Sequence, residues 1–285
     1  MCNCRKSCIF APKHEGHTHL FSDTPDTVEV CPMPHVCPIC GEPLSPAELE
    51  VAECRKVIEQ SDVAGGDETG MHVGGRNHWM WTFQTAAVTY LAAYEGRGKA
   101  EIDDMFPGGL PRTILVTDRL KAYFNMNVKN HQICLAHLLR NTTFFEELLP
   151  ESDWPKRMLA LLRESIHRRK TQETDVGDEE KFKRRFDELI DESVSIDNEE
   201  YQKLFDTFRK GLAAHREHIF LFLSHHAVPY DNICERGIRK VKIKMKNSGT
   251  FRSDARANAF LDLLSIVETT KKHNNSPYAA IRTLF

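Results

Sequence analysis

The sequence predicts an α/β fold: a mixed sheet with a helical insertion, preceded by a small Cys/His-rich segment. Strand-type runs alternate with short helical ones between residues 61 and 149. A helical hydrophobic period takes over at about 150–226, and six of the nine cysteines fall within the first forty residues. We therefore expect two domains, residues 1–60 and 61–285, with the insertion inside the second.

Runs of aromatic and β-branched residues predict the strands. They are a first strand that carries Asp67, strands at 78–83 and 86–94, a buried strand at 113–117, and a further candidate at 131–134. Between them, a short amphipathic helix at 99–106 ends at Pro107-Gly108-Gly109. Three consecutive strands, a crossover helix and further apolar strands are typical of an α/β pattern with a mixed sheet.

The second half of the chain is predicted to be mainly helical. Residues 136–149 form one expected helix, and apolar residues at helical spacing predict three or four more between 154 and 226. Within that stretch, residues 171–180 are polar and acidic, as in an exposed linker. The last stretch predicts a helix from 232, a turn at 247–249 and a long helix at 253–272.

Charge is unevenly distributed. The whole chain has a formal net charge of −3, but residues 236–256 contain eight bases and one acid, a local balance of +7. Such a density attracts polyanions, and each neutralised phosphate releases counterions, so binding should weaken with salt. A solvated helix face is the alternative interpretation of the same run.

The sequence indicates a soluble cytoplasmic protein. No run approaches the roughly 18 consecutive apolar residues that a membrane span requires. The N-terminus has too short an apolar stretch for a secretory signal. In a reducing compartment, thiols crowded among histidines suggest metal binding rather than disulfides.

The clearest metal motif is Cys37-Pro38-Ile39-Cys40-Gly41, which has the spacing of one half of a structural Zn²⁺ site. A complete site needs four ligands. Cys31 and His35 are candidates for the others, as are the cysteines at positions 2, 4 and 8. A vestigial motif without metal remains an alternative.

Three carboxylates stand at positions that suit catalysis. Asp67 lies in the first predicted strand, Asp118 follows the buried strand, and Glu235 begins a helix after the insertion. Carboxylates gathered at strand ends repel one another unless cations are present, and two divalent metal ions would both relieve this repulsion and assist phosphodiester chemistry. Each acidic residue taken alone is more typical of a turn or a helix cap.

The resemblance to a known family is carried by several ordered blocks. They are Asp67-Glu68-Thr69-Gly70 followed by Asn77-His78-Trp79, then residues 116–124, Cys134-Leu135-Ala136-His137, residues 231–239, and Phe251-Arg252-Ser253. In these blocks the chain resembles the insertion sequence 66 family of bacterial transposases, from residue 62 to residue 285. The resemblance implies a ribonuclease H-like catalytic domain of the Asp-Asp-Glu type.

The resemblance also implies a site, cofactors and partners. Asp67, Asp118 and Glu235 would hold two Mg²⁺ or Mn²⁺ ions, and His137 would lie beside them; a buried core histidine is the alternative for His137. Four bases would grip DNA phosphates: Arg236, Arg239, Lys242 and Lys246. The implied partners are transposon ends and target DNA, bound by a homo-oligomer that associates with the nucleoid.

One departure from the family pattern bears on activity. Family members carry a substantial helical region between the zinc element and the first catalytic Asp, whereas here only residues 41–62 separate them. Our first interpretation is a transposase that cleaves and joins DNA strands. The alternatives are a shortened, catalytically silent remnant that only binds DNA and zinc, and a ribonuclease H-like nuclease unrelated to mobile elements.

Overall fold

The computed structural model describes residues 45–284. The cysteine motif Cys37 and Cys40, with its further candidate ligands Cys31 and His35, lies outside the described residues. The described residues divide into two compact units. The first takes in residues 45–113, Lys121–Val128 and residues 233–284, and the second comprises Ile114–Leu120 and Lys129–Asn232.

A five-stranded mixed sheet organises the fold, in the order β3-β2-β1-β4-β5. Its strands are β1 (Val63–Val73), β2 (Arg76–Gln84), β3 (Thr89–Tyr94), β4 (Leu110–Thr117) and β5 (Val128–Ile133). The first three form an antiparallel meander in which Asp67 lies opposite Thr82. Gly74 and Gly75 make the two-residue turn between β1 and β2, both with positive φ, as that tight hairpin requires.

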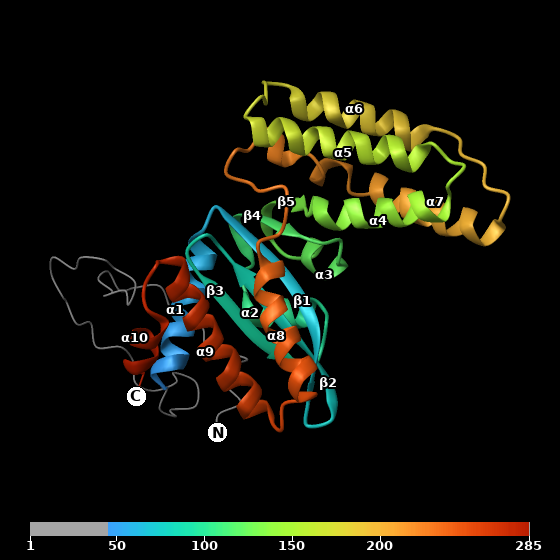
Figure 1. Ribbon diagram of the computed structural model, residues 1–285. Helices are drawn as coiled ribbons and strands as arrows, with labels where there is room; N and C mark the ends of the chain where they lie inside the picture. Colours follow the sequence, from blue (N-terminus) through green and yellow to red (C-terminus); the bar gives the residue numbers. More distant parts are fainter. Residues whose placement is uncertain (1–44, 285) are drawn as a thin grey trace. The chain divides into compact units, whose positions relative to one another are not determined.

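The first unit adds helices to this meander (Figure 1). They are α1 (Pro46–Gln60), α2 (Lys99–Met105), α3 (Lys121–Phe124), α8 (Cys234–Ser248), α9 (Asp254–Lys272) and α10 (Pro277–Arg282). Ser45 and Glu48 form a capping box that begins α1, and Ser253 caps α9 by accepting from the Arg256 amide.

The core of the first unit lies between the meander and the helices α8 and α9. Its buried residues are Met71, Val73, Met80, Leu91, Ile238, Val241, Phe251, Ala257 and Leu261. Hydroxyl groups of α9 also cover the edge strand β3: Ser265 Oγ accepts from the Leu91 amide and Thr269 Oγ1 from the Thr89 amide. Satisfying the backbone of an edge strand in this way blocks pairing with other chains.

The second unit contains four longer helices, which Figure 1 shows as a bundle of their own. They are α4 (Leu135–Leu148), α5 (Trp154–Thr171), α6 (Asp178–Asp191) and α7 (Glu199–Ala213), followed by short 3₁₀ turns at Arg216–His218 and Leu221–Leu223. Its core is aromatic: Trp154 meets Phe205 edge to face, and the indole Nε1 donates to the Leu189 carbonyl at 2.6 Å. The fully buried Trp154 thereby ties α5 to both α6 and α7.

The α/β class and the mixed sheet are confirmed, and helices occupy the expected insertion. Helix α1 is an addition, because sequence analysis places its residues in the Cys/His-rich segment. The helix packs on α9 and β3, with Cys54 Sγ 3.5 Å from Thr269 Oγ1. Residues 46–60 therefore pack with the first unit. None of the helices in the described range is long and apolar enough to cross a membrane.

Candidate active site

Asp67 lies in the middle of β1 on the face that packs against α8. Side chains alternate along a strand, so Asp67 shares its face with Met71 and Val73, which pack against Ile238 and Val241 of that helix. Its Oδ1 accepts from the Glu68 amide at 2.9 Å. The sequence-predicted residue therefore faces a helix rather than bulk solvent, in a half-buried position.

The neighbouring Glu68 points to the opposite face, and its carboxylate is already paired with other side chains. Its side chain is 1% exposed, Oε1 accepts from Arg97 Nε at 2.9 Å, and Oε2 accepts from the Tyr123 hydroxyl at 2.6 Å. Arg97 also stacks 4.5 Å from the centre of the Trp79 ring. Two adjacent carboxylates thus differ in role: Glu68 anchors the strand, and Asp67 is the one that faces α8.

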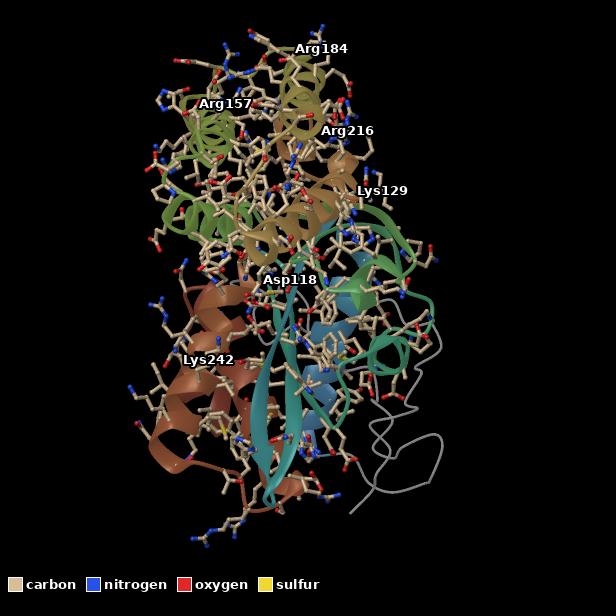
Figure 2. The ribbon with its side chains drawn as sticks, turned by 90° about the vertical axis from the view of Figure 1, so that its right-hand side faces the viewer. Asp118, Lys129, Arg157, Arg184, Arg216 and Lys242 are labelled. Carbon is tan, nitrogen blue, oxygen red and sulfur yellow. The ribbon has the colours of Figure 1, made fainter. Side chains whose placement is uncertain are left out.

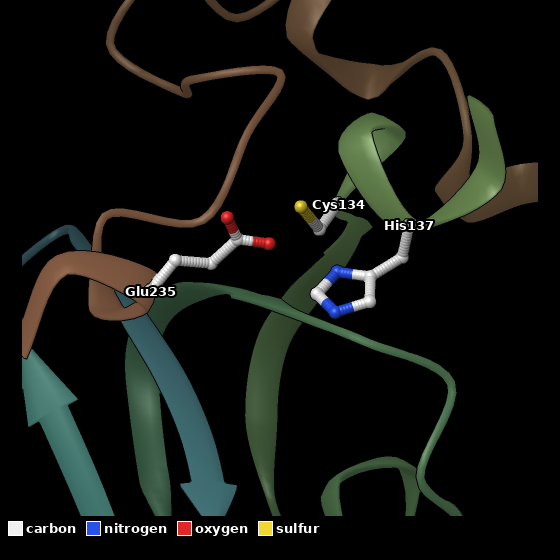
Figure 3. A group of neighbouring side chains, drawn as sticks. All are labelled: Cys134, His137 and Glu235. Atoms are coloured by element: carbon white, nitrogen blue, oxygen red, sulfur yellow. The ribbon is translucent and has the colours of Figure 1, made fainter. Parts of the chain in front are cut away.

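Glu235 belongs to the first turn of α8 (Figure 3). A negative side chain at this position interacts favourably with the helix dipole. The preceding residue, Cys234, is fully buried, and its thiol donates to the Thr82 carbonyl at 3.8 Å. Because Thr82 is the register partner of Asp67, the turn that carries Glu235 lies at the Asp67 position of the sheet.

The pKa of the Cys234 thiol also reflects how close the first turn of α8 lies to Asp67. Burial raises its pKa well above the usual value, the Asp67 charge raises it further, and the Lys272 ammonium opposes both effects. Cys234 is therefore a neutral core residue lying between an acid and a base. The first unit brings together the strand of Asp67 and the helix turn of Glu235.

Asp118 belongs to the second unit and directly follows β4 (Figure 2). Its Oδ1 accepts from the Leu120 amide at 2.8 Å, which closes a tight turn after the strand. The next residue, Arg119, lies 5.4 Å from the centre of the Phe208 ring. Burial lowers the pKa of Arg119, and the Asp118 carboxylate partly restores it.

Cys134 and His137 lie at the start of α4, one helical turn apart, as Figure 3 shows. The Cys134 amide donates to the Thr117 carbonyl at 2.8 Å, and its Sγ accepts from the Asn232 amide at 3.2 Å. The Sγ and a ring nitrogen of His137 lie within 4.8 Å of each other. This pair could supply two metal ligands, while Cys134 is also a buried core residue.

The basic run is mostly carried by α8. Arg239, Lys242 and Lys246 are exposed and recur at intervals of three and four residues, so they form one stripe. Figure 2 shows Lys242 pointing outward from the helix. Lys240 differs, because its ammonium pairs with Glu268 of α9. The side chain of Arg236 lies outside the described part of the structure.

Sequence analysis missed a polar group behind the first turn of α8. Lys272 Nζ donates to Gln84 Oε1 at 3.1 Å and to the carbonyls of Thr85 and Val88 at 2.7 Å each. These partners lie more than 180 residues from Lys272 in the chain, so no local pattern signals them. Burial lowers the pKa of Lys272 to about 8.

The strand order, with the added helices, fits a ribonuclease H-like transposase fold. The family model described as Transposase IS66 family matches residues 34–259, so the chain belongs to that family. The match spans both units, including the strand of Asp67, the turn after β4 and the helix turn of Glu235. No curated protein matches the chain.

Proposed function

We propose that this protein is a DNA transposase that cleaves DNA strands and transfers them during movement of a mobile element. Membership of a transposase family supports the general role. The observation that carries the catalytic proposal is the approach of the Glu235 turn to the Asp67 position of the sheet through Cys234 and Thr82.

Asp67, Asp118 and Glu235 are the proposed ligands of two Mg²⁺ or Mn²⁺ ions. Their carboxylate oxygens are the hard donors that these ions prefer. Glu68 is a poor candidate, because Arg97 and Tyr123 already occupy its oxygens. When bound, the ions would stabilise the charge on the attacking and leaving oxygens of a phosphodiester.

The chain's own residues then position the DNA. Helix α8 carries Glu235 in its first turn and the stripe Arg239, Lys242 and Lys246 over the following turns. At 1.5 Å per residue, Lys246 lies about 16 Å along the axis from Glu235. A DNA backbone held along this stripe, with Arg236 as a further contact, would present a phosphate to the end of the helix that carries Glu235.

His137 is the proposed fourth member of the site. An imidazole N–H near a scissile phosphate can donate a hydrogen bond to it and hold its orientation. In this interpretation Cys134 positions the start of α4 through its contacts with Thr117 and Asn232. We further propose that the protein acts as a homo-oligomer on paired transposon ends and target DNA.

The test is cleavage by the purified full-length chain, with Asp118→Asn as the inactive variant. The amide keeps the carboxylate's shape but lacks its charge, so cleavage of supercoiled DNA in Mg²⁺ or Mn²⁺ should fall by orders of magnitude. The exposed Asp191 of α6 provides a matched control, and Asp191→Asn should cleave like the wild type.

DNA binding should survive in Asp118→Asn, because binding depends on the α8 stripe. Strand transfer is assayed with oligonucleotides that end in the element's own termini. A wild-type chain that binds DNA yet cleaves no faster than Asp118→Asn, over a range of both metals, would be a catalytically silent remnant.

A further inference from the structure

The start of α8 needs a fixing contact from elsewhere in the fold. The residue before its first turn is Ile233, which has no polar side chain to accept from the free amides of that turn. Since Glu235 lies in this turn, its position depends on what the turn packs against. Cys234 supplies one contact through the Thr82 carbonyl.

The second contact is at Gly237, where the lack of a side chain lets the helix backbone pack against Gln84. A Cβ at this position would overlap the side-chain amide nitrogen of Gln84, the last residue of β2. Glycine weakens a helix interior relative to alanine. The close approach of Gln84 explains why a glycine stands at position 237 nevertheless. With Gln84 in this position, the helix backbone leaves no room for a Cβ at residue 237.

Gln84 is held rigidly in this place. Its Nε2 donates to Thr82 Oγ1 at 3.2 Å, and its Oε1 accepts from Thr89 Oγ1 at 3.3 Å and from Lys272 Nζ at 3.1 Å. The residue is 4% exposed. Because both ends of the Gln84 amide are hydrogen-bonded, it forms a rigid packing surface for α8 at Gly237.

Lys272, at the C-terminal end of α9, holds Gln84 and the turn that follows β2. An ammonium group has three protons to donate, and the three acceptors from the end of β2 and the following turn use them all. Burial lowers the pKa of Lys272 to about 8, as is typical of a lysine ammonium enclosed by protein. The charged end of Lys272 thus lies inside the first unit, behind the Glu235 turn.

We propose that Lys272 is a positioning residue, which fixes Gln84 and through it holds the first turn of α8, with Glu235, at the Asp67 position of the sheet. Lys272 itself makes no contact with DNA in this proposal. The inference rests on the proposed function only where it predicts weaker metal binding. The rigidity of the first turn of α8 is a property of the metal-free protein and is tested separately.

The first experiment is hydrogen exchange of the full-length, metal-free chain. In Lys272→Met, peptides that cover residues 234–241 should exchange at least about tenfold faster, because the turn loses its rigid support. Peptides from α7, in the other unit, should not change. Lys271 is the matched control: within residues 45–284 its exposed Nζ pairs with Glu268, and Lys271→Met should exchange like the wild type at 234–241.

The second experiment combines two substitutions: Gln84→Ala removes the side chain that packs against α8, and Gly237→Ala adds a methyl group in the space that it leaves. Gly237→Ala alone should speed exchange at 234–241, because the new methyl group pushes against Gln84. In Gly237→Ala with Gln84→Ala the methyl group has room, so protection should return toward the wild type. Simple addition of the two single effects would overturn the proposal, and this arm remains informative if Lys272→Met fails to fold.

The third measurement links positioning to the metal ions. Lys272→Met should raise the metal concentration for half-maximal DNA cleavage about tenfold or more, with the affinity for DNA unchanged. An unaltered metal dependence together with unaltered exchange would refute the inference while leaving the transposase proposal intact. A wild-type chain without cleavage, but with the expected exchange pattern, would refute the transposase proposal alone.

Discussion

The Tyr123 hydroxyl donates to Glu68 Oε2 at 2.6 Å, on the face of β1 opposite to the one that Asp67 occupies. Tyr123 is fully buried and comes from the short helix α3, so this hydrogen bond links that helix to the central strand. This link, with Arg97, fixes the backbone of β1 from behind. The candidate catalytic Asp67 therefore projects from a strand whose reverse face is anchored.

Breaking that anchor should destabilise the first unit. Glu68→Ala removes the carboxylate that accepts from the buried Tyr123 hydroxyl and pairs with Arg97. We expect a loss of about 2–3 kcal/mol in the free energy of unfolding, since Arg97 remains partly hydrated. Urea unfolding followed by Trp79 and Trp81 fluorescence measures it. Tyr123→Phe, which removes only the hydroxyl, should cost about 1 kcal/mol. Equal losses in the two variants would contradict this account of the Glu68 carboxylate.

The second unit should lose stability in mild acid because of a histidine cluster. His131 is buried, its ring lies 5.5 Å from that of His218, and His218 lies 6.4 Å from His215. Burial, followed by the nearby His218 and His215 rings, lowers the pKa of His131 to about 4. Between pH 6.5 and 4 the unfolded chain therefore binds a proton that the folded unit does not, and stability falls as the pH falls.

A shift of this size corresponds to about 3 kcal/mol at the acid end of the window. Of the three tryptophans only Trp154 lies in the second unit, so its fluorescence, in a Trp79→Phe and Trp81→Phe background, follows the unfolding of that unit. His131→Asn should flatten the pH dependence. A dependence as steep as that of the parent protein would assign the effect to other groups.

Zinc binding is a prediction for residues outside the described part of the chain. The Cys37 and Cys40 spacing predicts about one equivalent of Zn²⁺ in the reduced protein, since paired thiolates favour tetrahedral zinc. Cys40→Ser should lose the ion, while Trp154 fluorescence and the unfolding of the second unit stay unchanged. Metal analysis that finds no zinc in the wild type would favour a vestigial motif.

Sequence reasoning succeeded where local patterns are strong. Runs of aromatic and β-branched residues predicted β2 and β3, and apolar residues at helical spacing predicted α5. Helix α1 was missed, although its capping box at Ser45 and Glu48 is a local signal, because the nearby cysteines suggested a metal segment instead.

The candidate site could be predicted only in part. Asp67, Asp118 and Glu235 each stand near an end of a predicted element or within it, so pattern and family resemblance reach them. The support behind them depends on contacts between distant parts of the chain, such as Lys272 with Gln84 or Tyr123 with Glu68. Spacing along the sequence does not show those contacts. The count of eight bases between residues 236 and 256 likewise includes Lys240, although its ammonium pairs with Glu268.

The last prediction uses that difference between two lysines of α8. If Lys242 contacts a DNA phosphate, Lys242→Ala should reduce the slope of log affinity against log salt by about 1 and weaken binding to all sequences about equally. Lys240→Ala removes the same charge from the same helix, but its partner Glu268 keeps that charge from DNA, so its slope should match the wild type. Fluorescence anisotropy with a labelled duplex over a range of salt concentrations measures both slopes. Equal reductions in the two variants would mean that the stripe acts only through its total charge, and a loss confined to one DNA sequence would indicate contacts to bases.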